Sequence, residues 1–143
     1  MKILVTGNLG YVGNVLTRML LNQKFDVIGC DVGFYPQGFL GLENSGYKQI
    51  KKDIRNLSIE DLKDVSAICH LAALSNDPLG EINLELTEEI NYKATIRLVK
   101  LAKEANVEKF IFSSSCSSYG MNEKTVNEES KLAPLTAYAK SKV

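Results

Sequence analysis

The sequence is poor in the residues that build metal and disulfide sites. It has one histidine, His70, and three cysteines, Cys30, Cys69 and Cys116, which lie far apart and form no Cys-x-x-Cys pair. A zinc site therefore lacks candidate ligands, and we expect no metal. Two of the cysteines lie in apolar strand ends, where cysteine usually serves as a small hydrophobic residue, so reduced thiols in a cytoplasmic protein are the expectation.

An excess of charge and long apolar runs are also missing. Seventeen Lys and Arg residues balance seventeen Asp and Glu residues, so no basic field is available to attract nucleic acid. The apolar runs are too short to cross a membrane, and Met1-Lys2 leads directly into a strand pattern rather than a secretory signal. We therefore predict a cytoplasmic protein with neither a nucleic-acid nor a membrane partner.

Glycine, by contrast, is concentrated where it has a chemical use. Residues 6–13 read Thr-Gly-Asn-Leu-Gly-Tyr-Val-Gly, directly after the apolar run 3–5. A glycine-rich turn between a buried strand and a helix is typical of a dinucleotide pyrophosphate site. Three glycines would serve the tight turn, the approach of the phosphates and the packing of helix on strand, in the order Gly7, Gly10 and Gly13. The helix N–H groups at Tyr11 and Val12 would then face the phosphate charge.

Strand and helix patterns alternate along the remaining chain, which predicts an α/β fold. The predicted strands are residues 2–6, 25–31, 47–50, 67–71 and 110–114. The predicted helices are residues 11–22, 57–62, a long one from 83 or 87 to 104, and one that begins near 136; residues 33–46 are predicted as a loop. Parallel strands with helical crossovers indicate a Rossmann-like, doubly wound parallel sheet that binds ligands at the carboxyl ends of its strands. The last helix is cut short, so we interpret residues 1–143 as one incomplete domain, the amino-terminal part of a longer protein.

Two acidic positions follow predicted strands. Asp31 lies 18 residues beyond Gly13, where a carboxylate can accept hydrogen bonds from the adenosine ribose and would repel a 2′-phosphate. No arginine follows closely, so the sequence favours NAD over NADP; an ordinary strand-end aspartate is the alternative. Asp53 could accept from the adenine amine while Ile54 packs on the ring, although a solvated turn carboxylate explains Asp53 almost as well.

A tyrosine and a lysine near the end of the chain form a candidate catalytic pair. Tyr138 and Lys142 are four residues apart, on one face of a helix. A phenol titrates near ~10 when unperturbed, and a neighbouring ammonium lowers that value toward the range useful for a base. Ser115 follows a strand and could hydrogen-bond a substrate oxygen. Each feature alone is common: Tyr-x-x-x-Lys occurs by chance, and serine-rich segments are often polar loops.

Together these residues resemble the extended short-chain dehydrogenase/reductase family, and particularly its NAD-dependent nucleotide-sugar epimerase and dehydratase branch (UDP-glucose 4-epimerase-like). The resemblance covers essentially the whole chain. The motifs that carry it are Thr6-Gly7-x-x-Gly10-x-x-Gly13, Asp31, Asp53-Ile54, His70-Leu-Ala-Ala73, Asn91, Phe112-Ser-Ser-Ser115 with Tyr119-Gly120, and Tyr138-x-x-x-Lys142.

The resemblance implies roles for individual residues. Ser115, Tyr138 and Lys142 look like the catalytic triad, with NAD as the cofactor and a nucleotide-sugar as the substrate. Further cofactor contacts are implied for Leu71, Ala72, Ala73, Asn91 and Ser113. For Asn91 a polar residue on the helix surface is the alternative, and His70 is interpreted as a packed strand residue rather than a catalyst. The long helix and the helix near 136 resemble the pair through which the family forms homodimers.

Departures from the family pattern leave the reaction subtype open. Cys116 and Ser117 do not match the acidic pair of the sugar 4,6-dehydratases, which lowers that interpretation, and Ser75 replaces a substrate-side residue of some epimerases. Family members run about twice as far and bind the sugar with their second half, so we expect cofactor binding with negligible turnover from this chain alone. The alternatives are a keto-sugar reductase or dehydratase with the same triad, and a non-catalytic NAD-binding module.

Overall fold

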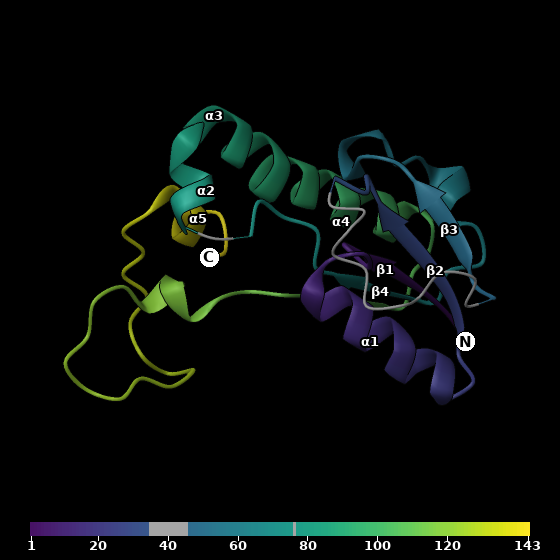
Figure 1. Cartoon of the computed structure of the whole chain (residues 1–143), viewed down its shortest axis with the longest axis horizontal. Coiled ribbons are helices and arrows are strands. Elements are labelled where there is room, and N and C mark those ends of the chain that lie inside the picture. Colours follow the sequence, from purple (N-terminus) through teal and green to yellow (C-terminus); the bar gives the residue numbers. More distant parts are fainter. Residues whose placement is uncertain (35–45, 76) are drawn as a thin grey trace. The chain divides into compact units, whose positions relative to one another are not determined.

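A computed structural model describes residues 1–34, 46–75 and 77–143, which form two compact units. Unit 1 comprises Met1–Ala72 and Ile96–Phe112, and unit 2 comprises Ala73–Thr95 and Ser113–Val143. Figure 1 follows the chain through both. Most of the predicted loop 33–46 lies outside the described residues. None of the helices in the described ranges is long and apolar enough to span a bilayer.

Unit 1 is built on a five-stranded parallel sheet in the order β3-β2-β1-β4-β5. The strands are β1 (Lys2–Thr6), β2 (Asp26–Asp31), β3 (Lys48–Lys51), β4 (Ala67–His70) and β5 (Lys109–Phe112). The reversal of strand order on either side of β1 is the switch point at which doubly wound sheets bind ligands. The predicted fold class is confirmed. The predicted bounds of β1 are correct, and those of the other four strands differ from the observed ones by at most two residues.

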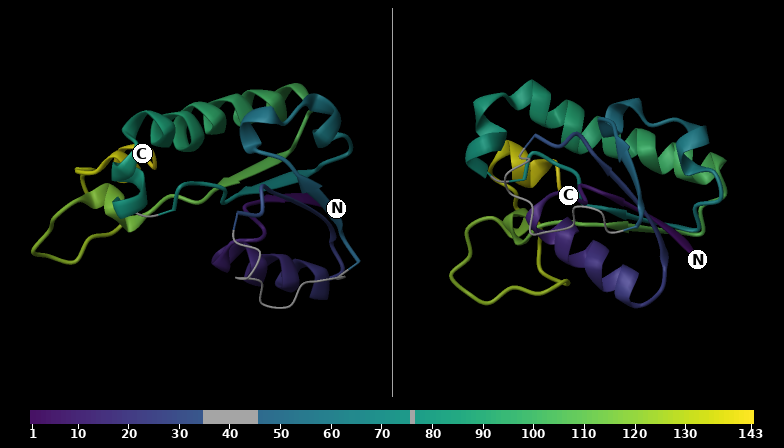
Figure 2. Two further views of the ribbon diagram at one scale, coloured as in Figure 1. Left: turned by 45° about the horizontal axis from the view of Figure 1, so that its top comes forward. Right: turned by 45° about the vertical axis from the view of Figure 1, so that its right-hand side comes forward.

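Helices cover both faces of this sheet. The helix α1 (Tyr11–Asn22) lies on one face, and the part of α4 (Ala94–Glu104) that belongs to unit 1 lies on the other (Figure 2). Alternate strand residues therefore enter two different cores. The core beneath α1 combines buried strand residues with half-buried leucines of the helix, namely Ile3, Val5, Val27, Ala67 and Cys69 with Leu16, Leu20 and Leu21.

The predicted short helix 57–62 was wrong. Two separate 3₁₀ turns, Ile54–Asn56 and Ile59–Leu62, occupy this region instead. Leu57 interrupts them because its backbone is extended, with ψ near 141°, and its side chain is fully buried in unit 1. Ser58 then begins the second turn through a capping box with Asp61, which satisfies the N–H groups at its start.

Unit 2 contains the start of the long helix and the last helix. The long helix begins at α3 (Leu84–Thr87), with Asn83 as its side-chain N-cap, continues through a π-helical stretch, Glu88–Lys93, and ends as α4. Its predicted extent is confirmed. Thr136 caps α5 (Ala137–Lys140), which confirms the predicted start of the last helix. The prediction missed α2 (Asp77–Ile82), which is too short for an apolar period to reveal.

Candidate active site

The glycine turn after β1 packs backbone against backbone. Gly7 has φ of 73°, a left-handed conformation that favours glycine, and a Cβ there would lie 2.7 Å from the backbone nitrogen of Ala72. At Gly13 a Cβ would lie 2.0 Å from the Gly7 carbonyl oxygen. The first and last glycines of the motif are therefore required by the turn itself. The structure also brings Gly7 next to the predicted cofactor contacts Leu71 and Ala72 at the end of β4.

The start of α1 is open to an anion. Gly10 is its N-cap and offers no side-chain hydrogen bond, and the first turn contains no acidic residue. The first N–H groups of a helix have no acceptor in a preceding turn, and here no capping side chain accepts from them. No acidic side chain in the first turn balances the positive end of the helix dipole either. Tyr11 and Val12 are largely exposed there. These features fit the pyrophosphate of a dinucleotide, as the sequence predicts.

Asp31 lies at the carboxyl end of β2 beside the same turn. Its Oδ2 accepts from the backbone N–H of Leu9 at 3.2 Å, and its Oδ1 accepts from that of Gly33 at 2.8 Å. Each carboxylate oxygen has a second lone pair, so the half-buried side chain can still accept from a ribose hydroxyl. The contact with Leu9 joins Asp31 to the glycine turn, and the two predicted cofactor elements therefore form one structure.

The Asp53 carboxylate accepts hydrogen bonds from Arg55, two residues along the chain. Arg55 donates to this carboxylate from its backbone nitrogen at 2.8 Å, from Nε at 3.1 Å to both oxygens, and from Nη2 at 2.7 Å. The Arg55 side chain lowers the pKa of Asp53 below its usual range, mainly through these hydrogen bonds. An adenine amine would have to donate to a carboxylate that already accepts several hydrogen bonds from Arg55. Ile54 is buried, 5% exposed, so its contact with an adenine ring would be limited to its edge.

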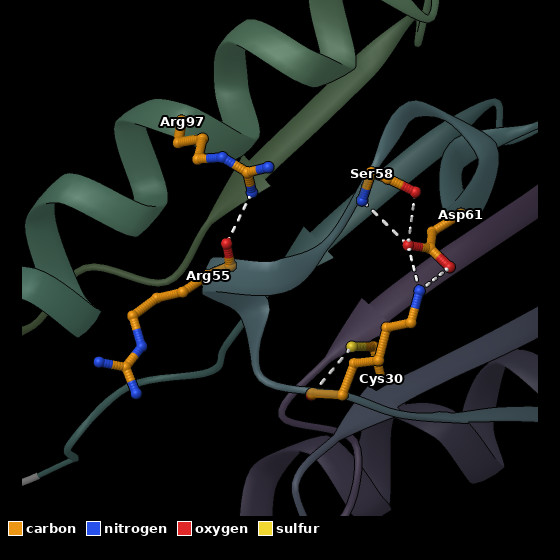
Figure 3. Close-up of polar contacts among 6 residues, drawn as sticks. Cys30, Arg55, Ser58, Asp61 and Arg97 are labelled. Carbon is orange, nitrogen blue, oxygen red and sulfur yellow. Dashed lines mark hydrogen bonds and ion pairs between the residues drawn. The ribbon is translucent and has the colours of Figure 1, made fainter.

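The segment after β3 is held in place by side chains on both sides (Figure 3). Lys52 donates to both carboxylate oxygens of Asp61 at 2.8 Å, and the same carboxylate accepts from Ser58. On the other side, Arg97 of α4 donates through Nη1 to the Arg55 carbonyl oxygen at 2.9 Å. The turn that carries Asp53 and Ile54 is thereby fixed to the sheet and to α4.

Sequence reasoning missed two buried polar groups beneath the glycine turn. Asn8, fully buried, donates to the Tyr47 hydroxyl at 3.0 Å and exchanges two hydrogen bonds with Gln49 of β3. Thr6 contacts Nδ1 of His70 at 2.6 Å and accepts from the Ala72 N–H. The signal for Asn8 was an amide inside an otherwise small and apolar turn. His70 is fully buried beside Phe110 and Phe112, as expected of a packed strand residue.

In unit 2 the structure brings Lys142 next to Tyr138. The Lys142 Nζ lies 5.8 Å from the centroid of the Tyr138 ring and donates to the Ser113 carbonyl oxygen at 3.1 Å. Ser114 Oγ donates to the Lys142 carbonyl at 2.7 Å, so the segment after β5 and the end of the last helix are joined twice. Burial lowers the pKa of Lys142 to about 8, which leaves the amine mostly protonated at neutral pH.

Ser115 lies in a turn, whereas Tyr138 lies in the last helix. It is the N-cap of a 3₁₀ turn, Cys116–Tyr119, and its Oγ accepts from the Ser117 N–H at 3.2 Å. The hydroxyl remains half-buried, and its hydrogen is available to a substrate oxygen because capping uses only a lone pair.

Asn91 lies in the π-helical stretch of the long helix and is 1% exposed. Its side chain accepts from the Leu74 N–H at 2.8 Å and donates to the Leu74 carbonyl and to Ser141 Oγ, each at 3.1 Å. The alternative of a polar residue on the helix surface was therefore wrong. Asn91 fixes the segment that follows Ala73 and also contacts the residue before Lys142.

Comparison with known proteins shows the family of this chain. The family model described as "NAD dependent epimerase/dehydratase family" matches residues 3–143. The chain is 32% identical to the uncharacterized UDP-glucose epimerase YtcB of Bacillus subtilis, over all of this chain and 49% of that protein. It is 30% identical to the UDP-glucose 4-epimerase of Lactobacillus helveticus, over all of this chain and 44% of that protein. The chain thus spans about half the length of these relatives.

Solved structures are similar over nearly the whole chain. UDP-glucuronic acid 4-epimerase from Bacillus cereus, in complex with NAD, matches 99% of this chain and 49% of that protein with a TM-score of 0.86 and 32% identity. The NDP-hexosamine 5,6-dehydratase TunA matches 99% of this chain and 46% of that protein with a TM-score of 0.90 and 28% identity. The fold, the glycine turn at its switch point and the match over residues 3–143 agree: the chain belongs to the NAD dependent epimerase/dehydratase family.

Proposed function

We propose that this chain is the NAD-binding and proton-transferring part of a nucleotide-sugar epimerase. The observation that carries the proposal is the position of Lys142, buried beside the Tyr138 ring and joined to the serines after β5. Burying a lysine amine costs free energy, and we take this cost to favour a functional purpose for Lys142. The chain covers about half of its relatives, so epimerisation is proposed for the whole protein and cofactor binding for the chain itself.

Tyr138 would remove the proton of a sugar hydroxyl. The Lys142 ammonium, close to the ring, would stabilise the phenolate that forms when the proton is removed. Ser115, whose cap leaves its hydrogen available, would donate to the same sugar oxygen and hold it against Tyr138. NAD, when bound, supplies the hydride acceptor that makes this proton transfer productive.

The residues proposed to bind NAD follow the order in which the chain presents them. The glycine turn and the open start of α1 would hold the pyrophosphate, through Gly7, Gly10, Tyr11, Val12 and Gly13. Asp31 would accept from the adenosine ribose and disfavour NADP, and Asp53 with Ile54 would contact adenine. The remaining contacts are proposed for Leu71, Ala72, Ala73, Asn91 and Ser113.

The relatives support a substrate class, and an exposed stripe on the long helix supports an oligomer. Two matched structures of the Bacillus cereus and MoeE5 enzymes contain UDP-glucuronic acid or UDP-glucose together with NAD, so a UDP-sugar is the proposed substrate of the whole protein. Tyr92, Ile96 and Val99 form an exposed apolar stripe at helical spacing along the long helix, which supports a homodimer through this helix.

Calorimetric titration of the chain with NAD and with NADP tests the cofactor half. We expect saturable NAD binding, weaker NADP binding, and loss of NAD affinity by about tenfold or more in Asp31→Ala, since a charge-assisted hydrogen bond contributes about 1.5–3 kcal/mol. Asp26→Ala is the matched control: it removes an exposed carboxylate from the opposite end of β2. Equal NAD affinity in all three proteins would contradict the proposed role of Asp31. A folded chain that binds neither dinucleotide would contradict cofactor binding by this chain.

A further inference from the structure

Asp77, at the start of α2, contacts both segments that carry the proposed proton-transfer residues. Its Oδ1 accepts a short hydrogen bond from the Thr136 hydroxyl, and its Oδ2 accepts from the Ser117 hydroxyl at 3.4 Å. Thr136 is the N-cap of α5, which carries Tyr138, and Ser117 belongs to the turn capped by Ser115. One carboxylate therefore lies between the two segments.

The contact with Thr136 is part of a relay into α5. The Thr136 hydroxyl donates to Asp77 and at the same time accepts from the Ala139 N–H at 3.0 Å, one residue beyond Tyr138. A hydroxyl whose hydrogen is fixed by a carboxylate directs its lone pair at the helix N–H and accepts more strongly. Asp77 thereby orients the cap as well as contacting it.

A second carboxylate of α2 supports the same helix end. Glu81, one turn after Asp77, accepts from the Ala137 N–H at 2.7 Å. Between them Gly80 allows close packing, since a Cβ there would lie 3.1 Å from the Tyr138 Cβ. Thr87 donates to the Gly80 carbonyl at 2.8 Å and so fixes α2 to the long helix. The N-terminal turn of α5 thus rests on α2 through two carboxylates and one close contact.

At the other end of α5, Ser141 Oγ accepts from the Asn91 side chain, and the Ser114 hydroxyl donates to the Lys142 carbonyl oxygen. Lys142 Nζ donates to the Ser113 carbonyl oxygen. Negative charge therefore supports the start of α5, where the helix dipole is positive, and the buried amine lies at its end.

We infer that Asp77 is a positioning residue: it fixes α5 against the Ser115 turn and so sets the placement of Tyr138 and Lys142. The inference rests on the proposed function, because it assigns Asp77 a purpose only if these residues act on one substrate. Asp77 itself touches no reacting group; it acts through Thr136 and Ser117.

The titration of Lys142 in the folded chain distinguishes positioning from a charge effect. Loss of a carboxylate alone can only lower the pKa of a nearby amine. Release of α5 would expose Lys142 and raise that pKa. In a chain labelled with ¹³C at the lysine Cε, with the Lys142 resonance assigned by Lys142→Arg, we expect Asp77→Ala to raise the Lys142 midpoint by about one unit or more.

Thr136 provides variants that leave every charge in place. Thr136→Val removes the relay and should raise the Lys142 midpoint as Asp77→Ala does, whereas Thr136→Ser keeps the hydroxyl and should leave it unchanged. The double variant Asp77→Ala/Thr136→Val should match the single ones if the two residues act in series. Should Asp77→Ala fail to fold, Thr136→Val and Thr136→Ser decide the matter.

A Lys142 midpoint that stays unchanged or falls in folded Asp77→Ala or Thr136→Val would overturn the inference. NAD titration of the same wild-type sample separates this result from the proposed function. Failure to bind NAD with the Lys142 response intact would count against the function and leave the coupling standing. NAD binding without the Lys142 response would count against Asp77 alone.

Discussion

The buried amine of Lys142 makes the stability of this chain depend on pH in a definite direction. Burial lowers the pKa of Lys142 from 10.5 to about 8 in the folded chain. Between these values the unfolded chain binds more protons than the folded one, so the free energy of unfolding rises with pH. Below about pH 8 the amine is charged in both states, and the cost of burying it is fully present. Above 10.5 it is neutral in both, and that cost is gone.

The two pKa values set the magnitude. At 1.36 kcal/mol per pKa unit, linkage raises the free energy of unfolding of wild type by about 1.3 kcal/mol between pH 7 and 9 and by about 2.5 kcal/mol between pH 7 and 10, as upper values. Burial also raises the pKa of Cys30 and Cys69 above that of a thiol in the unfolded chain, so these thiols contribute to the pH dependence too. The comparison must therefore be with Lys142→Met, which keeps the apolar stem and removes the amine.

Urea unfolding followed by circular dichroism at pH 7, 8, 9 and 10 measures this difference. We expect the stability of wild type relative to Lys142→Met to rise steadily over the series. Parallel profiles for the two proteins would refute the argument, because they would mean that the folded chain keeps Lys142 as hydrated as the unfolded one does.

Three further predictions use other contacts. Gly13→Ala should destabilise the chain by about 1–3 kcal/mol in urea unfolding, since its Cβ would lie 2.0 Å from the Gly7 carbonyl oxygen; an unchanged midpoint would contradict the tight turn. Asn91→Ala should cost about 1–3 kcal/mol by leaving the half-buried Leu74 backbone groups without their side-chain partner, and a neutral effect would contradict that network. With an aromatic disulfide reagent at pH 7.5, only exposed Cys116 should react quickly, because burial raises the pKa of Cys30 to about 12 and also raises that of Cys69; fast reaction of Cys116→Ser would contradict this.

The sheet could be predicted from sequence because its signals are local and repeated. The strands β1, β2, β4 and β5 contain short apolar runs, and α1 and the long helix have a 3.6-residue period. Parallel pairing therefore followed from these patterns and the connection rules. The short elements could not. The residues around Leu57 favour a helix, so the sequence predicts one there. In the structure the Leu57 side chain is buried, and the backbone at this residue is extended. Tertiary packing thus overrode local preference.

Some features of the candidate site could likewise be predicted from the sequence, and others could not. The spacing of Tyr138 and Lys142 is local and predicted that they lie close together. Their placement on one face of a helix was wrong, because α5 ends at Lys140 and Lys142 lies in the turn that follows. Spacing could not reveal that Arg55 supplies the Asp53 carboxylate with hydrogen bonds, because a side chain two residues away can point in several directions. Asp77 and Thr136 are 59 positions apart and meet only in the fold. No pattern within a single sequence marks such a pair.

The division into two units separates the glycine turn from the proposed proton-transfer residues. The chain passes between the units after Ala72, after Thr95 and after Phe112. The glycine turn and Asp31 lie in unit 1, whereas Tyr138 and Lys142 lie in unit 2. Substitutions in the two groups share no hydrogen-bond partner among the contacts described above, so their effects on stability should be additive. Substitution of Asp31 should then change the affinity for the dinucleotide, and substitution of Asp77 should change the titration midpoint of Lys142. A loss of the Lys142 shift in Asp31→Ala without dinucleotide would show that the two halves are energetically coupled, and that the proton-transfer residues depend on the glycine turn even before the cofactor binds.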